Sequence, residues 1–236
     1  MQFNSNQQLF EETVNQEGFE FFHFITYVNC PNFLLAAALS TVKTATETGG
    51  LGVIIDNRTD LTQPAPEKVI AGSKAEKAFV IVTPDVPLTT AQSMNFMLRI
   101  ATKMKAKFFT WIHGDGEVSG NPLTLIEECR KRNSAGEKWG VLFTLYDVYC
   151  AFNTEACNAI GDWDWLWFPF YFLDNDYYTR LKRAGYPCID IGGDGIIHHN
   201  NASNTIKNDK NRQLLNHYLF PVCEELFKQK YPDGTE

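Results

Sequence analysis

The sequence lacks several features that would assign it to a large class of proteins. No stretch is long, apolar and uncharged enough to span a bilayer, which predicts a protein without an integral membrane segment. The first twenty residues are polar and acidic, so a secretory signal peptide is not indicated and we expect a cytoplasmic location. The formal net charge is −7, and this lack of a basic excess argues against a nucleic-acid partner.

Paired cysteines and repeats are also missing. The six cysteines are far apart and none forms a Cys-x-x-Cys pair, which favours free, buried thiols over a disulfide framework. The sequence contains no internal repeat, low-complexity segment or interdomain linker. With 44% hydrophobic residues among 236, the chain can bury one sizeable core, so we expect a single domain over residues 1–236.

Strand-like and helix-like patterns alternate along the chain. An aromatic and β-branched strand at 21–28, a helix at 33–46 and a strand at 51–55 have the spacing of a β-α-β unit with parallel strands. The same patterns predict strands at 78–82, 107–112 and 140–149, short strands near 189 and 196–197, and helices at 91–104, 123–132, 174–184 and 209–228. The segment at 140–149 could begin an antiparallel pair. Together these elements predict an α/β fold.

Polar residues follow three of the predicted strands. Tyr27 and Asn29 follow the first, Asp56 and Asn57 the second, and residues 113–115 the buried strand at 107–112. In open α/β sheets, ligands bind at the carboxyl ends of the strands. We therefore expect these residues to converge on one ligand-binding crevice.

Two segments contain residues that bind metals. In the turn His113-Gly-Asp115-Gly-Glu117, the carboxylates suit a hard divalent ion beside a phosphate, and the glycines let the backbone approach a bulky ligand. His198 and His199 follow a predicted strand, where neighbouring side chains face opposite ways, so at most one should reach a given metal. An ordinary acidic turn and structural histidines are the alternative interpretation.

An aromatic segment precedes the helix at 174–184. A carboxylate at the edge of such an apolar wall has a raised pKa and can act as a general base, which makes Asp174 a candidate. Asp174 could instead be a helix N-cap, with Asp176 favouring the helix dipole. The tryptophans in this segment could stack on sugar rings or pack in the core.

Taken in order, these segments resemble the inverting glycosyltransferases of family 2, which have the GT-A fold. The resemblance spans residues 21 to 205 and is carried by Thr26-Tyr-Val-Asn29-Cys-Pro31, Asp56-Asn-Arg-Thr-Asp60, His113-Gly-Asp115, Gly161-Asp-Trp-Asp164, Asp174-Asn-Asp176 and Arg180-Leu-Lys-Arg-Ala-Gly-Tyr186. Two positions depart from the family pattern: His113 stands where the metal turn usually begins with Asp, and Leu173 where many relatives have Glu.

The resemblance implies a mixed, mainly parallel, Rossmann-like GT-A sheet flanked by helices. Residues 21–120 would bind the nucleotide sugar and 121–205 the acceptor. Outside the range of the resemblance, we expect residues 206–236 to form a C-terminal helix. The implied activity is metal-assisted transfer of a sugar, with inversion, from a nucleotide-diphosphate sugar to a hydroxyl of a glycan or another acceptor. Mn²⁺ or Mg²⁺ would be the cofactor.

The same resemblance implies residue roles. The donor would contact Thr26, Tyr27, Asn29, Asp56, Asn57, Asn95, His113 and Gly114. The metal would be held by Asp115 and one histidine, His198 rather than His199, with Glu117 nearby. Asp174 would be the general base, and Trp163, Asp164 and Asp176 would bind the acceptor.

Three other functions remain open at this stage. The first is a sugar-nucleotide nucleotidyltransferase. Such enzymes normally carry a Gly-rich, basic loop after the first strand, and the Asn-Cys-Pro sequence at 29–31 has no basic residue, which argues against this function. A metal-dependent hydrolase could be built on His113, Asp115, His198 and His199. A non-catalytic carbohydrate-binding protein would use the tryptophans alone.

Overall fold

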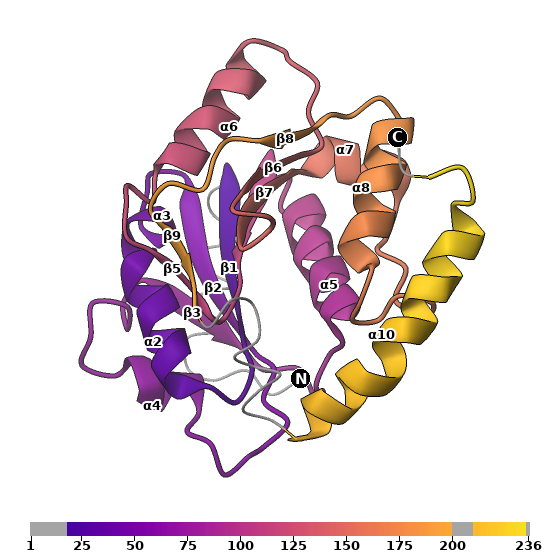
Figure 1. Ribbon diagram of the computed structural model, residues 1–236. Helices are drawn as coiled ribbons and strands as arrows, with labels where there is room; N and C mark the ends of the chain where they lie inside the picture. Colours follow the sequence, from indigo (N-terminus) through magenta and orange to yellow (C-terminus); the bar gives the residue numbers. More distant parts are fainter. Residues whose placement is uncertain (1–17, 200–209, 235–236) are drawn as a thin grey trace.

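A seven-stranded sheet runs through the middle of the molecule and separates two layers of helices (Figure 1). The computed structural model describes residues 18–199 and 210–234. In spatial order the strands are β3 (Phe79–Val82), β2 (Gly50–Asp56), β1 (Phe21–Tyr27), β4 (Phe108–Ile112), β7 (Tyr149–Asn153), β6 (Val141–Thr144) and β8 (Cys188–Asp190). Strands β3, β2, β1 and β4 are mutually parallel, whereas β7 is antiparallel to both its neighbours and β6 is parallel to β8.

A second, two-stranded sheet lies beside the first. It pairs β5 (Gly116–Val118) with β9 (Ile196–His198) in antiparallel orientation. These strands have three residues each, yet they join the turn after β4 to a segment about eighty positions later in the chain. This pairing fixes part of the candidate site described below.

The helices cover both faces of the large sheet (Figure 1). One layer contains α2 (Pro31–Ser40), α3 (Val42–Ala45), α4 (Pro66–Ile70) and α6 (Thr124–Ser134). The other contains α5 (Thr90–Lys103), α7 (Thr154–Ile160) and α8 (Leu173–Arg183). Helix α10 (Lys210–Lys230) packs against this second layer, where Phe227 contacts Phe168 and Phe172.

Both faces of strand β1 are buried, because successive side chains alternate between two cores. Phe22 and Phe24 pack into the core on the α5 side, whereas Phe21 and Ile25 pack into the core on the α2 side. All four side chains are fully buried. Burying one such side chain contributes about 1.5–3 kcal/mol, so this central strand is firmly held.

The predicted mixed, mainly parallel sheet flanked by helices is confirmed, and two element predictions are wrong. The strand at 140–149 is not continuous, because Leu145 and Tyr146 adopt positive φ angles that reverse the chain between β6 and β7. The segment does begin an antiparallel pair, which was the alternative for this segment. The single helix at 33–46 is divided at Thr41, whose hydroxyl donates to the Ala37 carbonyl and whose backbone leaves the helical region.

Further helices were not predicted from the sequence. Helices α4 and α7 were missed, since the first lies in a segment with two prolines that indicated a loop. The predicted C-terminal helix at 206–236 corresponds to α10, and its first four positions lie outside the described residues.

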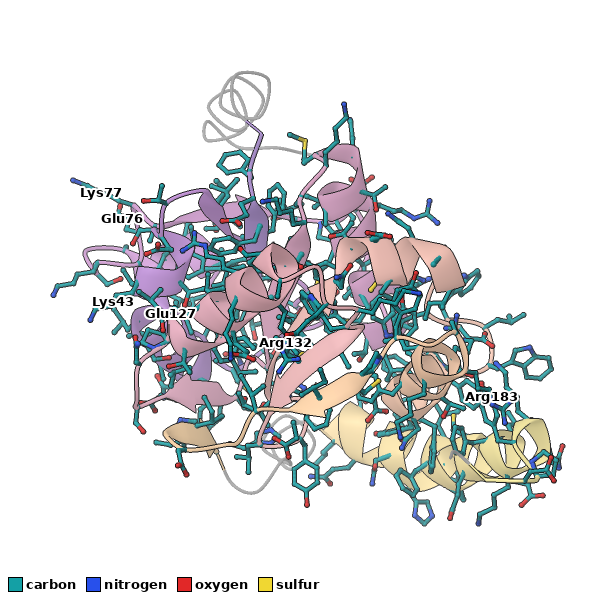
Figure 2. All side chains as sticks on the ribbon, turned by 90° about the horizontal axis from the view of Figure 1, so that it is seen from above. Lys43, Glu76, Lys77, Glu127, Arg132 and Arg183 are labelled. Carbon is teal, nitrogen blue, oxygen red and sulfur yellow. The ribbon has the colours of Figure 1, made fainter. Side chains whose placement is uncertain are left out.

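Charged side chains of both signs occupy the surface (Figure 2). Figure 2 shows Lys43, Glu76 and Lys77 projecting at one end of the molecule and Arg183 at the other, beside α10. There the Arg183 guanidinium lies 4.8 Å from the centre of the Tyr231 ring. Among the described residues, no helix has both the length and the apolar composition that crossing a membrane requires.

A titratable group lies inside the core at strand β1. His23 is fully buried, with its Nδ1 2.8 Å from the Thr110 hydroxyl of β4. Burial lowers the pKa of His23 from its ordinary value of 6.5 to about 3. The imidazole is therefore neutral in the folded protein at neutral and mildly acidic pH.

This histidine predicts a loss of stability in acid. The unfolded chain binds the His23 proton as the pH falls below 6.5, while the folded chain does not until about pH 3. The free energy of unfolding is therefore unaffected by His23 at pH values above 6.5, the pKa in the unfolded chain, and decreases at lower pH. Between pH 7 and pH 5 the decrease is about 2 kcal/mol. Urea unfolding at both pH values measures this decrease in the free energy of unfolding. The decrease should be about 2 kcal/mol smaller in His23→Asn than in the wild type. His217→Asn, at an exposed position of α10, should behave as the wild type; equal losses in all three proteins would contradict the assignment.

Candidate active site

A cavity of about 630 Å³ opens at the carboxyl ends of β1 and β4. The chain runs from β1 outward to β2 and β3 and then crosses back to β4 on the other side of β1, which makes this the point where the strand order reverses. Such switch points are the usual ligand sites of open α/β sheets. The cavity is lined by Tyr27 from β1, His113 after β4, Asp174 from α8 and His198 from β9.

The turn after β4 is closely fitted to β1. The His113 N–H donates to the Val148 carbonyl at 2.9 Å, and the Gly116 N–H donates back to the His113 carbonyl at 2.9 Å. A Cβ atom on Gly114 would lie 2.5 Å from the Thr26 carbonyl oxygen, so a side chain at this position would force the turn away from β1. Glycine is required here by the close approach of two backbone segments.

Strand β9 brings residues from late in the chain to this turn. Gly116 is paired with His198, and the His199 N–H donates to the Asp115 carbonyl at 3.0 Å. As a result, His198 Nε2 lies 3.2 Å from Asp115 Oδ1. The backbone pairing thus positions the imidazole beside the carboxylate.

Three side chains here can act together as metal ligands. Candidate ligand atoms of His113, Asp115 and His198 all lie within 4.8 Å of one another. Burial lowers the pKa of His113, which favours a neutral imidazole. Burial alone would raise the pKa of Asp115, but the His198 hydrogen bond and the nearby His113 outweigh it and lower the pKa. A neutral imidazole and an ionised carboxylate are the forms that bind metal ions.

Asp174 lies in the first turn of α8 and faces the same cavity. Phe172, immediately before the helix, has a left-handed backbone with φ of 58°, an uncommon conformation for a bulky residue. Burial, and then the negative charge of Asp147, raise the pKa of Asp174 from 3.8 to about 6. A carboxylate with this pKa is ionised at neutral pH and can accept a proton.

Sequence reasoning predicted the aromatic segment before Asp174 but missed Asp147 and the aromatic lining residues from other parts of the chain. Asp147 lies in the hairpin between β6 and β7, lines the cavity, and places Oδ1 3.6 Å from His113 Nε2. Further aromatic lining residues are Trp111, Tyr146, Phe152, Phe170, Tyr171, Phe172, Tyr178 and Phe220. The predicted ten-residue strand at 140–149 was the available signal for Asp147, because strands usually have five or six residues and an interior Asp favours a turn.

Five of the eight residues expected to contact the donor line the cavity. They are Thr26, Tyr27, Asn57, His113 and Gly114. Asn57 also binds both backbone polar groups of Leu88 through its side chain. These positions are available to a ligand on the strand-end side of the cavity.

Asn29, Asp56 and Asn95 are not among the residues that line the cavity. The Asn29 side chain binds Thr59 and the Asp60 N–H, and Asp56 forms a two-point ion pair with Arg58. The Asn95 amide donates to the Trp163 carbonyl and accepts from the Trp163 N–H. In this structure these three polar side chains bind other groups of the protein itself.

Glu117 and His199 contact each other rather than the cavity. The His199 Nε2 lies 2.9 Å from Glu117 Oε2, and the His199 ring stacks on Phe33 with centroids 5.3 Å apart. The two adjacent histidines therefore have different surroundings, with His198 the last residue of β9 and His199 the first residue after it.

Of the three residues expected to bind the acceptor, only Trp163 lines the cavity. Trp163 is buried and stacked on Tyr177 with ring centroids 3.5 Å apart. Asp164 accepts from the Trp167 N–H and pairs with Lys230 at 3.2 Å. Asp176 is fully buried.

The Asp176 carboxylate is bound by three groups. It pairs with Arg180 at 2.9 Å and Lys230 at 2.7 Å, and it accepts from the Tyr231 hydroxyl at 2.7 Å. These contacts fasten α10 to α8. Asp176 is not among the residues that line the cavity, so it is not positioned to contact an acceptor bound there.

Unpartnered polar atoms are concentrated at the cavity. Eight buried side-chain polar atoms of the described residues have no hydrogen-bond partner, and four belong to cavity-lining residues: Thr26 Oγ1, Ser93 Oγ, Trp111 Nε1 and His113 Nε2. Buried polar groups normally have partners, so such a cluster favours a site that a polar ligand completes.

Comparisons by sequence find no match among protein families or curated proteins. Comparison by structure finds glycosyltransferases. The mannosyltransferase PcManGT from Pyrobaculum calidifontis, solved with GDP-Man and Mn²⁺, is 12% identical with a TM-score of 0.58, over 79% of this chain and 61% of that chain. Glucosyl-3-phosphoglycerate synthase from Mycobacterium tuberculosis, solved with Mg²⁺ and UDP, is 12% identical with a TM-score of 0.54, over 80% and 74%.

A third similar structure is TarS from S. aureus, with 12% identity and a TM-score of 0.52 over 69% of this chain and 33% of that chain. The present chain thus spans about three fifths of the mannosyltransferase and a third of this TarS structure. The shared architecture confirms that the chain has the GT-A fold.

The position of Asp147 predicts how Asp174 titrates. Replacing Asp147 by Asn removes a negative charge that raises the Asp174 pKa, so that pKa should fall from about 6 toward 3.8. A carbon-13 NMR titration of the Asp174 carboxyl would measure it. Asp233→Asn, at an exposed position outside the cavity, is the matched control and should leave the Asp174 titration unchanged. An unaltered titration in Asp147→Asn would show that burial alone sets the pKa.

Proposed function

We propose that the protein is a glycosyltransferase that moves a sugar from a nucleotide-diphosphate sugar to an acceptor hydroxyl, with inversion and with the help of a divalent metal. One observation carries the proposal: the cavity at the switch point of a GT-A sheet is lined both by three side chains that could bind a metal ion and by a buried carboxylate whose pKa is raised to about 6. The similar structures were solved with GDP-Man and Mn²⁺ and with UDP and Mg²⁺, which supports this assignment.

The strand ends would hold the donor. Thr26, Tyr27 and Asn57 lie at the carboxyl ends of β1 and β2, and Gly114 allows the turn after β4 to pack closely against β1 beside them. Asp115 and the β9 histidine supply carboxylate and imidazole ligands for Mn²⁺ or Mg²⁺. When bound, such a cation neutralises the charge that develops on the leaving diphosphate.

Asp174 would act as the general base. Its carboxylate takes the proton of the acceptor hydroxyl as the hydroxyl oxygen bonds to the anomeric carbon and the bond from that carbon to the diphosphate oxygen breaks. A single displacement of this kind inverts the configuration. The aromatic side chains other than Trp163 that line the cavity with Asp174 would offer apolar faces to a sugar ring and limit the access of water to the base.

A metal-dependent hydrolase is the second candidate, because two histidines and an aspartate also suit metal-assisted hydrolysis. The two functions differ in their products. A hydrolase releases phosphate from nucleotides without any sugar donor, whereas the transferase releases a nucleoside diphosphate only as the sugar moves.

A thermal-shift screen of UDP-, GDP-, dTDP- and CMP-sugars, with and without Mn²⁺, identifies the donor, because a ligand that binds the native state raises its melting temperature.

Asp115 is expected to be essential for metal-dependent donor binding. Asp115→Ala removes the only carboxylate of the ligand set, so Mn²⁺ should no longer strengthen the binding of the nucleotide diphosphate found in the screen. Calorimetry with and without Mn²⁺ measures this, and circular dichroism checks that the fold is intact. Asp233→Ala, outside the cavity, should retain the metal effect. Metal-dependent affinity that persists in Asp115→Ala would exclude this carboxylate as a ligand.

Asp174→Asn preserves the shape of the side chain but removes the proton acceptor. Sugar transfer should decrease by about 10²–10⁴-fold, the usual contribution of a general base, while donor affinity changes little. Release of nucleoside diphosphate in the presence of a panel of hydroxyl acceptors, with product mass, gives the rate. Asp162→Asn, whose carboxylate pairs with Arg99 outside the cavity, should retain transfer. Transfer near the wild-type rate in Asp174→Asn would assign the base to another group.

A further inference from the structure

The start of α8 forms one side of the cavity, and aromatic side chains surround it. Six of these, called the aromatic wall below, line the cavity: Tyr146, Phe170, Tyr171, Phe172, Tyr178 and Phe220. The ring centroid of Phe220, on α10, lies 5.3 Å from that of Phe172 and 5.5 Å from that of Tyr171. Phe220 and Tyr146 are 43% and 81% exposed, so the aromatic wall reaches the surface of the molecule.

The charged side chains of the cavity are acidic. They are Asp115, Asp147 and Asp174, and none of the described residues that line the cavity is a lysine or an arginine. Asp147 and Asp174 lie close to the aromatic wall, since burial and then their negative charges raise the pKa of Tyr178. The neighbouring His113 does not offset the charge of Asp147, because burial lowers the pKa of this imidazole and favours its neutral form. An anionic acceptor would therefore meet two negative charges where little water screens them.

A cationic acceptor is disfavoured for a different reason. A positive charge beside Asp174 would stabilise the ionised carboxylate and lower its pKa from about 6 toward 3.8. A general base works best when its pKa lies near the working pH, so this decrease would slow the removal of the hydroxyl proton. An uncharged acceptor leaves the raised pKa of Asp174 in place.

An acceptor with many hydroxyls also fits the aromatic wall poorly. One hydroxyl can donate to Asp174, but others would lie against Phe170, Phe172 and Phe220, whose side chains offer no hydrogen bond. Burying a hydroxyl without a partner is unfavourable, whereas an aromatic body packs against such rings in offset or edge-to-face contact.

We propose that the acceptor is an uncharged alcohol or phenol with an aromatic or similarly flat, apolar body, bound with its hydroxyl at Asp174 and its body against the aromatic wall. The inference rests on the proposed function and specifies its acceptor. Asp147 acts in this arrangement as a specificity-determining residue, because its charge rejects anionic acceptors.

Four compounds separate the alternatives. Biphenylmethanol is uncharged, (hydroxymethyl)biphenylcarboxylate is anionic and (aminomethyl)biphenylmethanol is cationic at neutral pH, while methyl maltoside is uncharged with many hydroxyls. Ligand-observed NMR measures their affinity for the full chain, and transfer is measured with the donor found in the screen and Mn²⁺. Biphenylmethanol should bind at least about tenfold more tightly than the anionic compound and the maltoside. The cationic compound should be transferred with a kcat about tenfold lower than that of biphenylmethanol.

Two variants test the residues. Asp147→Asn should strengthen binding of the anionic compound about tenfold and change the affinity for biphenylmethanol little, whereas Asp233→Asn, outside the cavity, should behave as the wild type. Phe220→Ser should weaken binding of biphenylmethanol about fivefold or more. Leu214→Ser, at an exposed position of the same helix outside the cavity, is its matched control and should not. Melting curves establish that each variant is folded, and the comparison of compounds in the wild type depends on no variant.

The outcomes distinguish this inference from the proposed function. Affinity for the anionic compound or the maltoside that equals that for biphenylmethanol, an equal kcat for the cationic compound, or no binding of biphenylmethanol would overturn the inference. Transfer to sugars but not to biphenylmethanol would do so and leave the function in place. Binding of biphenylmethanol that depends on Phe220, in a protein that transfers from no nucleotide sugar, would refute the function and keep the assignment of the apolar binding site.

Discussion

The pairing of two three-residue strands, β5 and β9, determines the site. It joins the turn that carries Asp115 to the segment that carries His198, and the His199 N–H completes it by binding the Asp115 carbonyl. Without this pairing, His198 would have no fixed position relative to the carboxylate. The strand ends at His198, which lies beside the aspartate, and His199, the next residue, binds Glu117 instead.

A second arrangement sets the protonation of Asp174. The start of α8 is enclosed by aromatic side chains, and burial together with the charge of Asp147 raises the pKa to about 6. The helix is kept in place by Asp176, whose buried carboxylate binds Lys230 and Tyr231 at the end of α10. Contacts outside the cavity thus help to maintain the position of the carboxylate inside it.

Several polar residues that look like ligand contacts in the sequence instead join separate segments of the chain. Asn29 joins the loop after β1 to the loop after β2, and Asn95 binds the backbone on both sides of Trp163. The amide side chain offers a donor and an acceptor, so it can satisfy two backbone groups at once. These contacts brace the segments that form the wall of the cavity.

The sequence by itself determined the α/β class, the order of most elements and the polar strand ends, because hydrophobic periodicity and turn residues are local properties. It also indicated Asp115, Asp174 and one histidine of the 198–199 pair as site candidates, and the structure places Asp115, Asp174 and His198 at one cavity. Only the tertiary structure decided that Asp147 lies beside His113 and that Asp176 lies outside the cavity. Those outcomes depend on a hairpin with two positive-φ residues and on helix packing across 55 positions of the chain, and neither leaves a local pattern in the sequence.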